Sequence, residues 1–374
     1  MDHENLKYRI ALGLIQGIGH VTAKSLISYL GGVKEIFESK YQELIKIPGV
    51  GEFMAKRIVE QKKTALDDAE KEIKFIDKQN IQVLFYLDKS YPYLLKQCND
   101  APLILFVKGN IDFNQSKLIS IVGTRKASSV GKNNCEKLIE RMASGIHKPV
   151  IVSGLAYGID ICAHRSALKY NLDTIAVLGH GFDRIYPQPH KTTASEIIDH
   201  GALVSDFSSQ MKFEPQNFLK RNRIIAGLSE ATIVIESGIK GGSLVTAEIA
   251  NSYNREVFAI PGRLEDPLSE GCNFLIKSNK AFLLQYYEDI PYLLNWENNK
   301  NVHQQRNIFV ELSDDEKVLA RILIQTGKYP IDMICKESSF NMNKVSSLLL
   351  QMEFKGVVRC MPGKVYEFIG VLND

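Results

Sequence analysis

Residues 218–248 read FLKRNRIIAGLSEATIVIESGIKGGSLVTAE, and this stretch decides the fold. A basic helical segment leads into the apolar run 231–235, which is followed by the glycine turn 238–243 and a second helical segment. A strand that enters a helix through a glycine turn presents backbone N–H groups and the positive end of the helix dipole to an anion. The stretch therefore predicts a phosphate site, with Lys240 beside it as a charge partner.

Strands and helices alternate around this stretch, from residue 117 to residue 262. Five of the six expected strands are rich in β-branched residues and continuously apolar, which is typical of strands buried on both faces of a parallel sheet. The six runs are 118–122, 150–152, 174–178, 202–205, 231–235 and 257–260. They predict an α/β fold with a doubly wound sheet, whose ligand lies at the carboxyl ends of the strands.

Glycine-bearing turns follow four of these runs, at 123–128, 153–160, 179–183 and 238–243. Since the carboxyl ends of parallel strands share one edge, these turns are expected to converge. Asp160 and His164 stand four residues apart on one helix, a spacing that permits a catalytic pair or half of a metal site. No third ligand and no nucleophile accompany them at motif spacing, so we interpret them as a helix cap and a hydrogen-bonded histidine. We expect no catalytic residue, metal or cofactor.

Composition excludes several classes of protein. The 374 residues are 45% hydrophobic and carry a formal net charge of +3, which suits two or three globular domains and requires that any polyanion be bound by local patches. The first residues lack the pattern of a signal peptide, and no apolar run reaches the roughly 18 residues of a membrane span. The six cysteines are scattered without metal-ligand spacing. We expect a cytoplasmic protein with no membrane partner.

The amino-terminal segment contains an internal repeat, in which GIGHVTAK at 17–24 returns as GVGEFMAK at 49–56. A glycine–apolar–glycine turn between short helices leaves N–H groups free for a non-specific phosphate contact. Residues 1–66 therefore resemble a tandem helix-hairpin-helix (SAM-like) domain. A small helical docking or dimerisation domain, in which the glycines only cap helices, explains the pattern equally well.

The carboxyl-terminal segment is set apart by a polar linker at 298–310. A capping box at 313–316 then opens the first of three helices, which precede a hairpin at 356–368. Residues 311–374 resemble a winged-helix domain. Its third helix carries only Lys344 near its start, so a protein contact and a weak contact with DNA both remain open. The remaining part, 67–297, is the expected Rossmann domain.

The order of motifs resembles the DNA-processing protein A (DprA, or Smf) family over essentially the whole chain. The motifs are VGTR at 122–125, SGLAYGID at 153–160, RNRIIAGLS at 221–229 and KGGSLVTAEIA at 240–250. The resemblance implies a homodimer, built around an extended Rossmann-like domain, that binds and protects single-stranded DNA and loads the RecA recombinase in natural transformation. It implies a binding protein rather than an enzyme.

The resemblance also implies that Arg125 contacts DNA, in agreement with an arginine that can fork onto a phosphate from a loop at a strand end. Lys220, Arg221 and Arg223 crowd one helix but do not all share a face, so some could pair with acids such as Glu230 or Glu236. The complete expected DNA-binding set is Gly123, Thr124, Arg125, Lys126, Ser153, Gly154, Lys220, Arg221, Arg223, Lys240, Gly241, Gly242 and Ser243. Phe213 and Phe218 are candidate surfaces for stacking of an unpaired base.

A rival hypothesis is an enzyme of the nucleoside-monophosphate phosphoribohydrolase type, which shares this Rossmann variant and uses a Gly-Gly-x-Gly-Thr-x-x-Glu loop. Gly241, Gly242 and Glu248 fit that loop, but Leu244 and Val245 replace its Gly-Thr pair. Leu244 is expected to crowd the place where bare backbone would approach a nucleotide. DNA binding is therefore the preferred interpretation.

Overall fold

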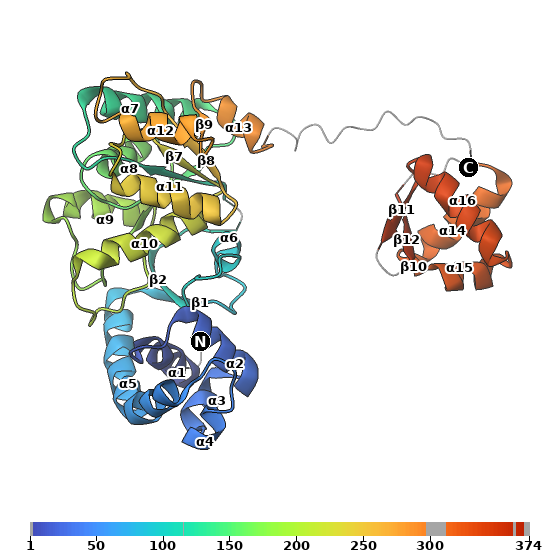
Figure 1. Ribbon diagram of the computed structural model, residues 1–374, viewed down its shortest axis with the longest axis horizontal. Helices are drawn as coiled ribbons and strands as arrows, with labels where there is room; N and C mark the ends of the chain where they lie inside the picture. Colours follow the sequence, from blue (N-terminus) through green and yellow to red (C-terminus); the bar gives the residue numbers. More distant parts are fainter. Residues whose placement is uncertain (1–2, 115, 297–311, 362–363, 370–374) are drawn as a thin grey trace. The chain divides into compact units, whose positions relative to one another are not determined.

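The computed structural model describes residues 3–114, 116–296, 312–361 and 364–369. The chain falls into two compact units, Met1–Trp296 and Glu297–Asp374 (Figure 1). The linker predicted at 298–310 lies outside the described residues. Within the described ranges, no helix has both the length and the apolar character needed to cross a bilayer.

The described part of the first unit contains one sheet of nine strands, in the order β1-β2-β6-β5-β4-β3-β7-β8-β9. Neighbours from β6 to β9 pair in parallel, whereas β2 is antiparallel to both β6 and β1. The strands are β1 (Gln82–Phe85), β2 (Ile104–Gly109), β3 (Leu118–Val122), β4 (Val150–Ser153), β5 (Thr174–Val177), β6 (Gly201–Ser205), β7 (Ala231–Val234), β8 (Glu256–Ala259) and β9 (Phe282–Leu283). The six strands expected between 117 and 262 are confirmed, and the two-residue edge strand β9 was not predicted.

Helices cover both faces of this sheet. Alternate residues of β3 show why the strands are continuously apolar, because Ile119 and Ile121 pack in one hydrophobic cluster and Leu118 and Val122 in another. The first cluster includes residues of α7 (Ser129–Ser144) and α8 (Ile159–Lys169), and the second includes residues of α10 (Pro215–Leu228) and α11 (Gly242–Ser252). The doubly wound α/β architecture is thereby confirmed.

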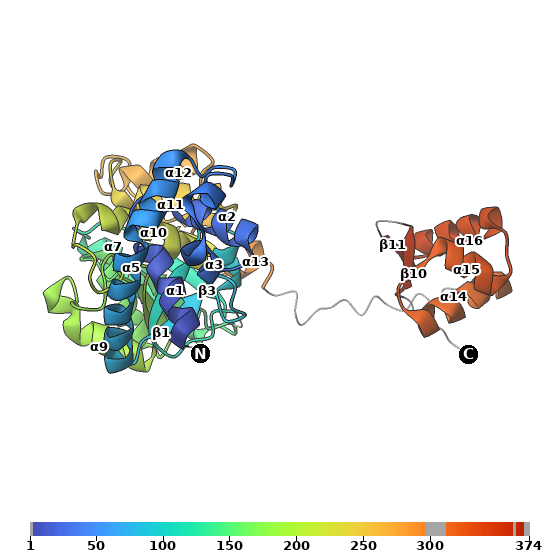
Figure 2. The ribbon, with the colours of Figure 1, turned by 90° about the horizontal axis from the view of Figure 1, so that it is seen from below.

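The amino-terminal helices gather at one end of the first unit, at the bottom of Figure 1 and facing the viewer in Figure 2. In both copies of the repeat, the first glycine adopts positive φ, 87° at Gly17 and 84° at Gly49, and the second caps the next helix. The helices are α1 (His3–Leu14), α2 (His20–Leu30), α3 (Val33–Glu38), α4 (Tyr41–Leu44) and α5 (Glu52–Gln79). The predicted boundary between residues 66 and 67 falls inside α5, which runs through it.

The β1–β2 pair belongs to two hydrophobic cores at once. Its residues Phe85 and Phe106 pack in the cluster formed by the amino-terminal helices. Its residues Leu84 and Leu105 point the other way and pack in the cluster beneath α10 and α11. Because successive side chains of a strand face opposite sides, these two short strands join the helical segment to the sheet through apolar contact.

Among its described residues, the second unit contains three helices and a three-stranded sheet in the order β10-β12-β11. The Ser313 side chain accepts the Glu316 N–H and the Glu316 side chain accepts the Ser313 N–H, which confirms the predicted capping box. The elements are α14 (Asp314–Thr326), β10 (Tyr329–Pro330), α15 (Ile331–Ser338), α16 (Met342–Phe354), β11 (Val358–Met361) and β12 (Val365–Phe368).

The remaining helices of the first unit are α6 (Tyr93–Lys96), η1 (Gln188–His190), α9 (Lys191–Asp199), α12 (Glu270–Lys277) and α13 (Asp289–Leu293).

Candidate nucleic-acid interface

The candidate site lies where the order of the strands reverses. The chain runs outward from β3 through β4 and β5 to β6, and then returns to place β7 on the other side of β3. At such a switch point the loops after the two central strands diverge and leave a crevice at their carboxyl ends. Here these loops are tied together, because the Thr124 N–H donates to the Glu236 carbonyl oxygen at 2.7 Å.

The loop after β3 holds two cations at the surface. A Cβ atom added at Gly123 would lie 2.5 Å from the Ile159 side chain, so only glycine lets the loop pass this close to α8. The Lys126 N–H donates to the Thr124 hydroxyl at 3.2 Å and tightens the turn. The side chains of Arg125 and Lys126 are exposed, as a contact with a phosphate backbone requires.

A buried carboxylate that the sequence did not mark as part of the site supports this loop. Glu236 accepts hydrogen bonds from the backbone N–H of Ser128 at 2.8 Å and from its hydroxyl at 2.5 Å. The Ser128 hydroxyl in turn accepts the Gly131 N–H and caps α7. Glu236 therefore binds the start of α7. The pairing with a basic residue of α10 that the sequence analysis considered for Glu236 is not formed. Glu230 likewise accepts the Trp296 indole N–H at 2.8 Å.

The glycine turn before α11 is built as a tight connection with an exposed outer side. The Ser243 hydroxyl donates to the Ser237 hydroxyl at 2.7 Å inside the turn, and a Cβ atom at Gly241 would lie 2.2 Å from that Ser237 oxygen. Lys240 and Gly242 are exposed, whereas Leu244 packs in the core beneath α11. The expectation that Leu244 crowds the turn is therefore wrong, since its side chain points inward.

Four residues of the expected DNA-binding set are buried: Ser153, Gly154, Arg221 and Ser243. The Ser153 hydroxyl donates to the Ile121 carbonyl oxygen at 2.6 Å inside the sheet. The structure contradicts a surface contact with DNA for these four residues, because they lie beneath the loops that the sequence placed them on.

Arg221 is the most consequential of these corrections. The residue is 3% exposed, and its guanidinium donates to the carbonyl oxygens of Gly154, at 2.7 Å, and Val177. Burial lowers the pKa of Arg221 to about 10, and the nearby Asp160 carboxylate opposes that decrease. A Cβ atom at Gly154 would lie 2.5 Å from the guanidinium nitrogens, so this glycine makes room for the arginine. Arg221 ties the loops after β4 and β5 to α10 from below the site.

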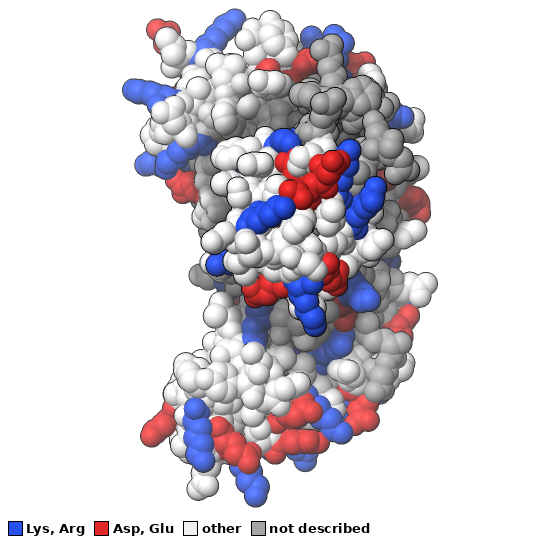
Figure 3. Space-filling model, turned by 90° about the vertical axis from the view of Figure 1, so that its right-hand side faces the viewer, with Lys and Arg blue, Asp and Glu red and all other residues white. Residues whose placement is uncertain are grey.

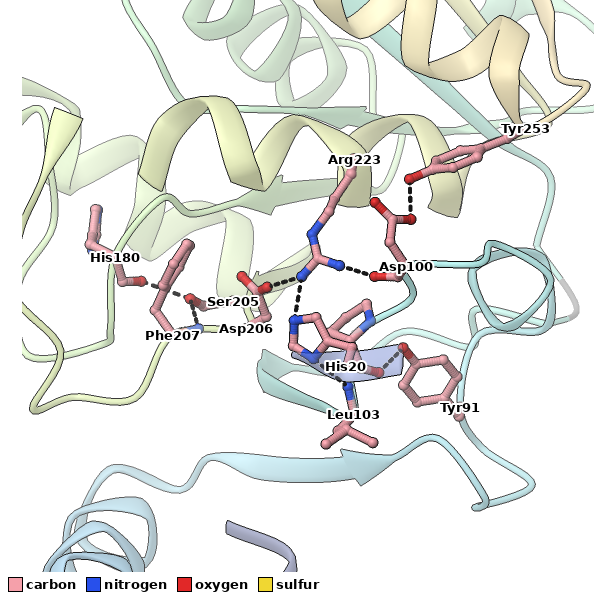
Figure 4. Close-up of polar contacts among 11 residues, drawn as sticks. His20, Tyr91, Asp100, Leu103, His180, Ser205, Asp206, Phe207, Arg223 and Tyr253 are labelled. Carbon is pink, nitrogen blue, oxygen red and sulfur yellow. Dashed lines mark hydrogen bonds and ion pairs between the residues drawn. The ribbon is translucent and has the colours of Figure 1, made fainter. Parts of the chain in front are cut away.

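Arg223 is also occupied within the protein, at the contact between α10 and the amino-terminal helices (Figure 4). It forms an ion pair with Asp206 at 2.5 Å, donates to the Asp100 carbonyl oxygen, and lies 2.9 Å from the His20 Nε2 atom. Its side chain is only 13% accessible. Of the three basic residues on this helix, Lys220 alone is exposed and remains available for DNA.

The same contact bears on the amino-terminal repeat. His20 begins α2, directly after the first glycine turn, and the Leu103 N–H lies 3.3 Å from its Nδ1 atom. The side chain that follows the turn therefore contacts α10 and the strand region, whereas Gly17 and Gly19 of the turn itself are exposed. Burial, with Arg223 as a second cause, lowers the pKa of His20 to about 4. The first hairpin is thus attached to the sheet through His20, and its exposed turn is compatible with both the docking and the phosphate-contact interpretations.

Asp160, in the first turn of α8, and His164, in the middle of that helix, occupy structural positions. Asp160 accepts the Ala156 N–H at 3.4 Å, and burial raises its pKa. Thr174 donates its hydroxyl to the Ile151 carbonyl oxygen, so the His164 Nδ1–H donates to the Thr174 oxygen at 2.7 Å. Complete burial lowers the pKa of His164 to about 3. The described residues contain no group of three or more His, Cys, Asp or Glu side chains placed to hold a metal.

Aromatic side chains continue the edge beyond the loop after β5. Phe213 packs against Phe218 with ring centroids 5.6 Å apart, and Tyr186 packs against both, at 5.0 Å and 5.5 Å. A Cβ atom at Gly179 would lie 2.8 Å from the Phe218 ring. Phe213 is 37% exposed and Tyr186 46% exposed, so this cluster presents aromatic surface to solvent. Tyr186 was not predicted to belong to the site, and its exposure became visible only in the fold.

Charge elsewhere on the molecule is mixed, as the net charge of +3 predicts. Figure 3 shows lysines and arginines interspersed with aspartates and glutamates across the face it presents. In the second unit, Lys344 forms an ion pair with Asp315 at 2.9 Å and lies 4.0 Å from the Phe340 ring centroid. The one cation near the start of α16 is thus balanced by an acid, which weakens the interpretation of α16 as a DNA-reading helix.

Known proteins match this chain along its length. The sequence profile described as DNA recombination-mediator protein A matches residues 82–295, and profiles described as a SAM-like helix-hairpin-helix tandem and as a DprA winged helix domain match 10–64 and 310–364. Protein Smf of Synechocystis sp. is 31% identical over 98% of this chain and 100% of its own. The DNA processing protein DprA of Streptococcus pneumoniae is 40% identical over 57% of this chain and 73% of its own.

Two solved structures resemble the fold. The X-ray structure of DNA processing protein A from Streptococcus pneumoniae has a TM-score of 0.66 and 33% identity, and covers 76% of this chain and 97% of that one. The protein of the same name from Helicobacter pylori has a TM-score of 0.52 and 27% identity, and covers 58% of this chain and 96% of that one. The latter structure is described as giving insight into a unique single-stranded DNA binding mode.

Proposed function

Because the chain belongs to the DNA recombination-mediator protein A family, we propose that it binds single-stranded DNA along the carboxyl edge of its sheet. The observation that carries the proposal is the placement of Arg125, Lys126 and Lys240 on exposed glycine turns at the switch point. These turns follow two different β-strands, β3 and β7. Their cations are therefore spread along the edge of the sheet and are not gathered around a single phosphate. A row of cations suits a polymer backbone.

The proposed path of the single-stranded DNA continues from the switch point along the edge of the sheet toward β5. Lys220 extends the row of cations on α10, and the exposed rings of Tyr186 and Phe213 offer stacking surface for bases. Stacking accepts every base because each has a flat π face, so binding should show little preference for sequence. The buried Arg221 and Arg223 take part only by holding the loops and α10 in place.

The proposal extends to the cellular role that the family resemblance implies. The protein acts as a homodimer in the cytoplasm, protects incoming single strands and loads RecA recombinase onto them during natural transformation. The helical segment before the sheet and the winged-helix unit flank the DNA-binding part. The ranges 1–66, 67–297 and 311–374 are therefore proposed as functional segments. They are not proposed as separately packed domains.

The test is a titration of oligothymidylate followed by fluorescence anisotropy at several salt concentrations. Arg125→Ala and Lys240→Ala should each weaken binding by about tenfold, because each removes a charge-assisted contact, and should lower the slope of log affinity against log salt by about 0.7. Arg141→Ala is the matched control, since Arg141 is exposed in the last turn of α7, far from its amino-terminal end.

Unchanged affinity and slope in both variants would contradict the proposed path. The enzymatic alternative is tested in the same preparations by incubation with nucleoside monophosphates. Release of free base would favour the phosphoribohydrolase type over a protein that only binds.

A further inference from the structure

A pocket of about 730 Å³ lies beside the switch point, between α7, α8 and η1. Arg125 and Lys126 form its border on the side of the β3 loop, so it opens from the proposed path of the strand. Its size falls within the range of about 300–1,000 Å³ that is typical of small-molecule sites. None of the residues deeper in the pocket belonged to the expected DNA-binding set.

The pocket is strongly cationic. Lys132 from α7 and Arg165 and Lys169 from α8 join Arg125 and Lys126 in its lining. Lys169 is neutralised by Glu136, at 2.6 Å, which is the one acidic residue of the lining. Among the described residues, no carboxylate forms an ion pair with any of the other four cations. Four unpaired positive charges around one cavity favour a phosphate-bearing ligand.

One wall of the pocket is aromatic and apolar. The Tyr157 ring is 46% exposed and packs edge-on against His190, with centroids 4.9 Å apart. His190 is itself fixed by a hydrogen bond between its Nδ1 atom and the Leu155 carbonyl oxygen at 2.7 Å. Ile161 adds apolar surface from α8. A flat ring held in place beside a cationic wall suits a nucleobase attached to a phosphate.

We propose that this pocket binds one nucleoside phosphate, with the phosphate at Lys132 and Arg165 and the base against Tyr157. The ligand is either a free nucleotide or one nucleotide of the bound strand, and the second source rests on the proposed function. Because Arg125 and Lys126 belong to both the pocket and the edge, a nucleotide in the pocket would extend the contact of the strand down the α7–α8 side of the sheet.

Cys162 supplies a built-in reporter, because its thiol lines the pocket and is partly exposed. A hydrogen bond from the buried Cys135 thiol is the main cause that lowers the pKa of Cys162 to about 7, so the thiol should react with alkylating reagents near neutral pH. Cys360 is exposed in the second unit and serves as an internal control. A ligand in the pocket should slow alkylation of Cys162 and leave that of Cys360 unchanged.

The experiment measures iodoacetamide labelling of both cysteines by peptide mass spectrometry in the full-length protein. The additions are thymidine 5′-monophosphate, an oligothymidylate of about 20 nucleotides, and inorganic phosphate. We expect the nucleotide, the oligonucleotide or both to slow labelling of Cys162 by about fivefold or more near saturation. Protection by the free nucleotide identifies a nucleotide site, and protection by the oligonucleotide alone identifies a site for the strand.

Matched variants separate the pocket from the edge. Lys132→Ala combined with Arg165→Ala should abolish protection, whereas Lys137→Ala, an exposed lysine of α7 outside the pocket, should retain it. Absence of protection in every sample would overturn the proposal, and equal protection by inorganic phosphate would overturn its nucleoside part. Binding of the oligonucleotide by anisotropy, with protection of Cys162 by neither the oligonucleotide nor the free nucleotide, refutes the pocket alone. Protection by the free nucleotide without binding of the strand refutes the proposed function alone.

Discussion

Substitution of Arg223 by alanine should destabilise the first unit strongly, although the sequence places this arginine in the DNA-binding motif. The guanidinium connects three segments that are far apart in the chain: Asp206 after β6, Asp100 before β2 and His20 at the start of α2. The carboxylate of Asp206 is nearly inaccessible, and its other oxygen, Oδ1, has no hydrogen-bond partner. Loss of Arg223 would therefore leave a buried carboxylate without a counterion.

The magnitude follows from that burial. Removal of one partner of a buried ion pair costs about 3–5 kcal/mol, because the remaining charge is left uncompensated. With a denaturant dependence of about 3 kcal/mol per molar urea, the midpoint of unfolding should fall by about 1 M or more. Arg223→Lys should lower the free energy of unfolding by less, because lysine keeps the positive charge. Some loss should remain, because lysine has no planar group that reaches all three partners.

The assay is urea unfolding followed by the fluorescence of Trp296, the single tryptophan of the chain. Trp296 is buried against the sheet and donates to Glu230 at 2.8 Å, so it reports on the first unit. Lys220→Ala is the matched control, because Lys220 is exposed on the same helix and its loss should change the free energy of unfolding by less than about 0.5 kcal/mol. Equal midpoints for Arg223→Ala and Lys220→Ala would refute a stabilising role for this cluster.

Two further predictions concern the whole protein. His164 and His20 have pKa values of about 3 and about 4 in the folded protein against 6.5 in the unfolded chain, so the unfolded state binds more protons as the pH falls below 6.5. Stability should therefore decrease by up to about 1.4 kcal/mol per pH unit for each histidine down to those pKa values, and a urea midpoint that stays constant from about pH 7 to pH 5 would contradict this. The proposed homodimer should sediment as a dimer at micromolar concentration, and a strict monomer would undercut the proposed loading of RecA.

Local pattern was sufficient to predict the six strands between 117 and 262 and the edge at which their glycine turns lie. Continuous apolar runs such as 118–122 identify buried parallel strands because both faces of the strand are covered, and no knowledge of the covering helices is needed. The glycine turns after β3 and β7 were likewise placed correctly at one edge. Arg125, Lys126 and Lys240 are exposed there because a short turn leaves a long side chain no room except outward.

The roles of Lys220, Arg221 and Arg223 could not be separated in the same way. Their spacing shows that they cannot all share a face, but it does not show which face of α10 meets the sheet. The partners of the two arginines are backbone carbonyl oxygens and the side chains of Asp206 and His20. None of these groups is close in sequence to the arginine that it binds, so acids near in sequence were considered instead. Long-range burial of charge is a property of the assembled fold.

The two-faced β1–β2 pair determines where the chain can be divided. Removal of the helices before it would expose Phe85 and Phe106 on one face of the β1–β2 pair, and exposed apolar patches of this kind promote aggregation. A sheet fragment that starts at residue 67 would also begin in the middle of α5. Gene fusions, truncations and exchanges between relatives should therefore keep the residues up to Trp296 together. The first suitable position for a junction lies after Trp296.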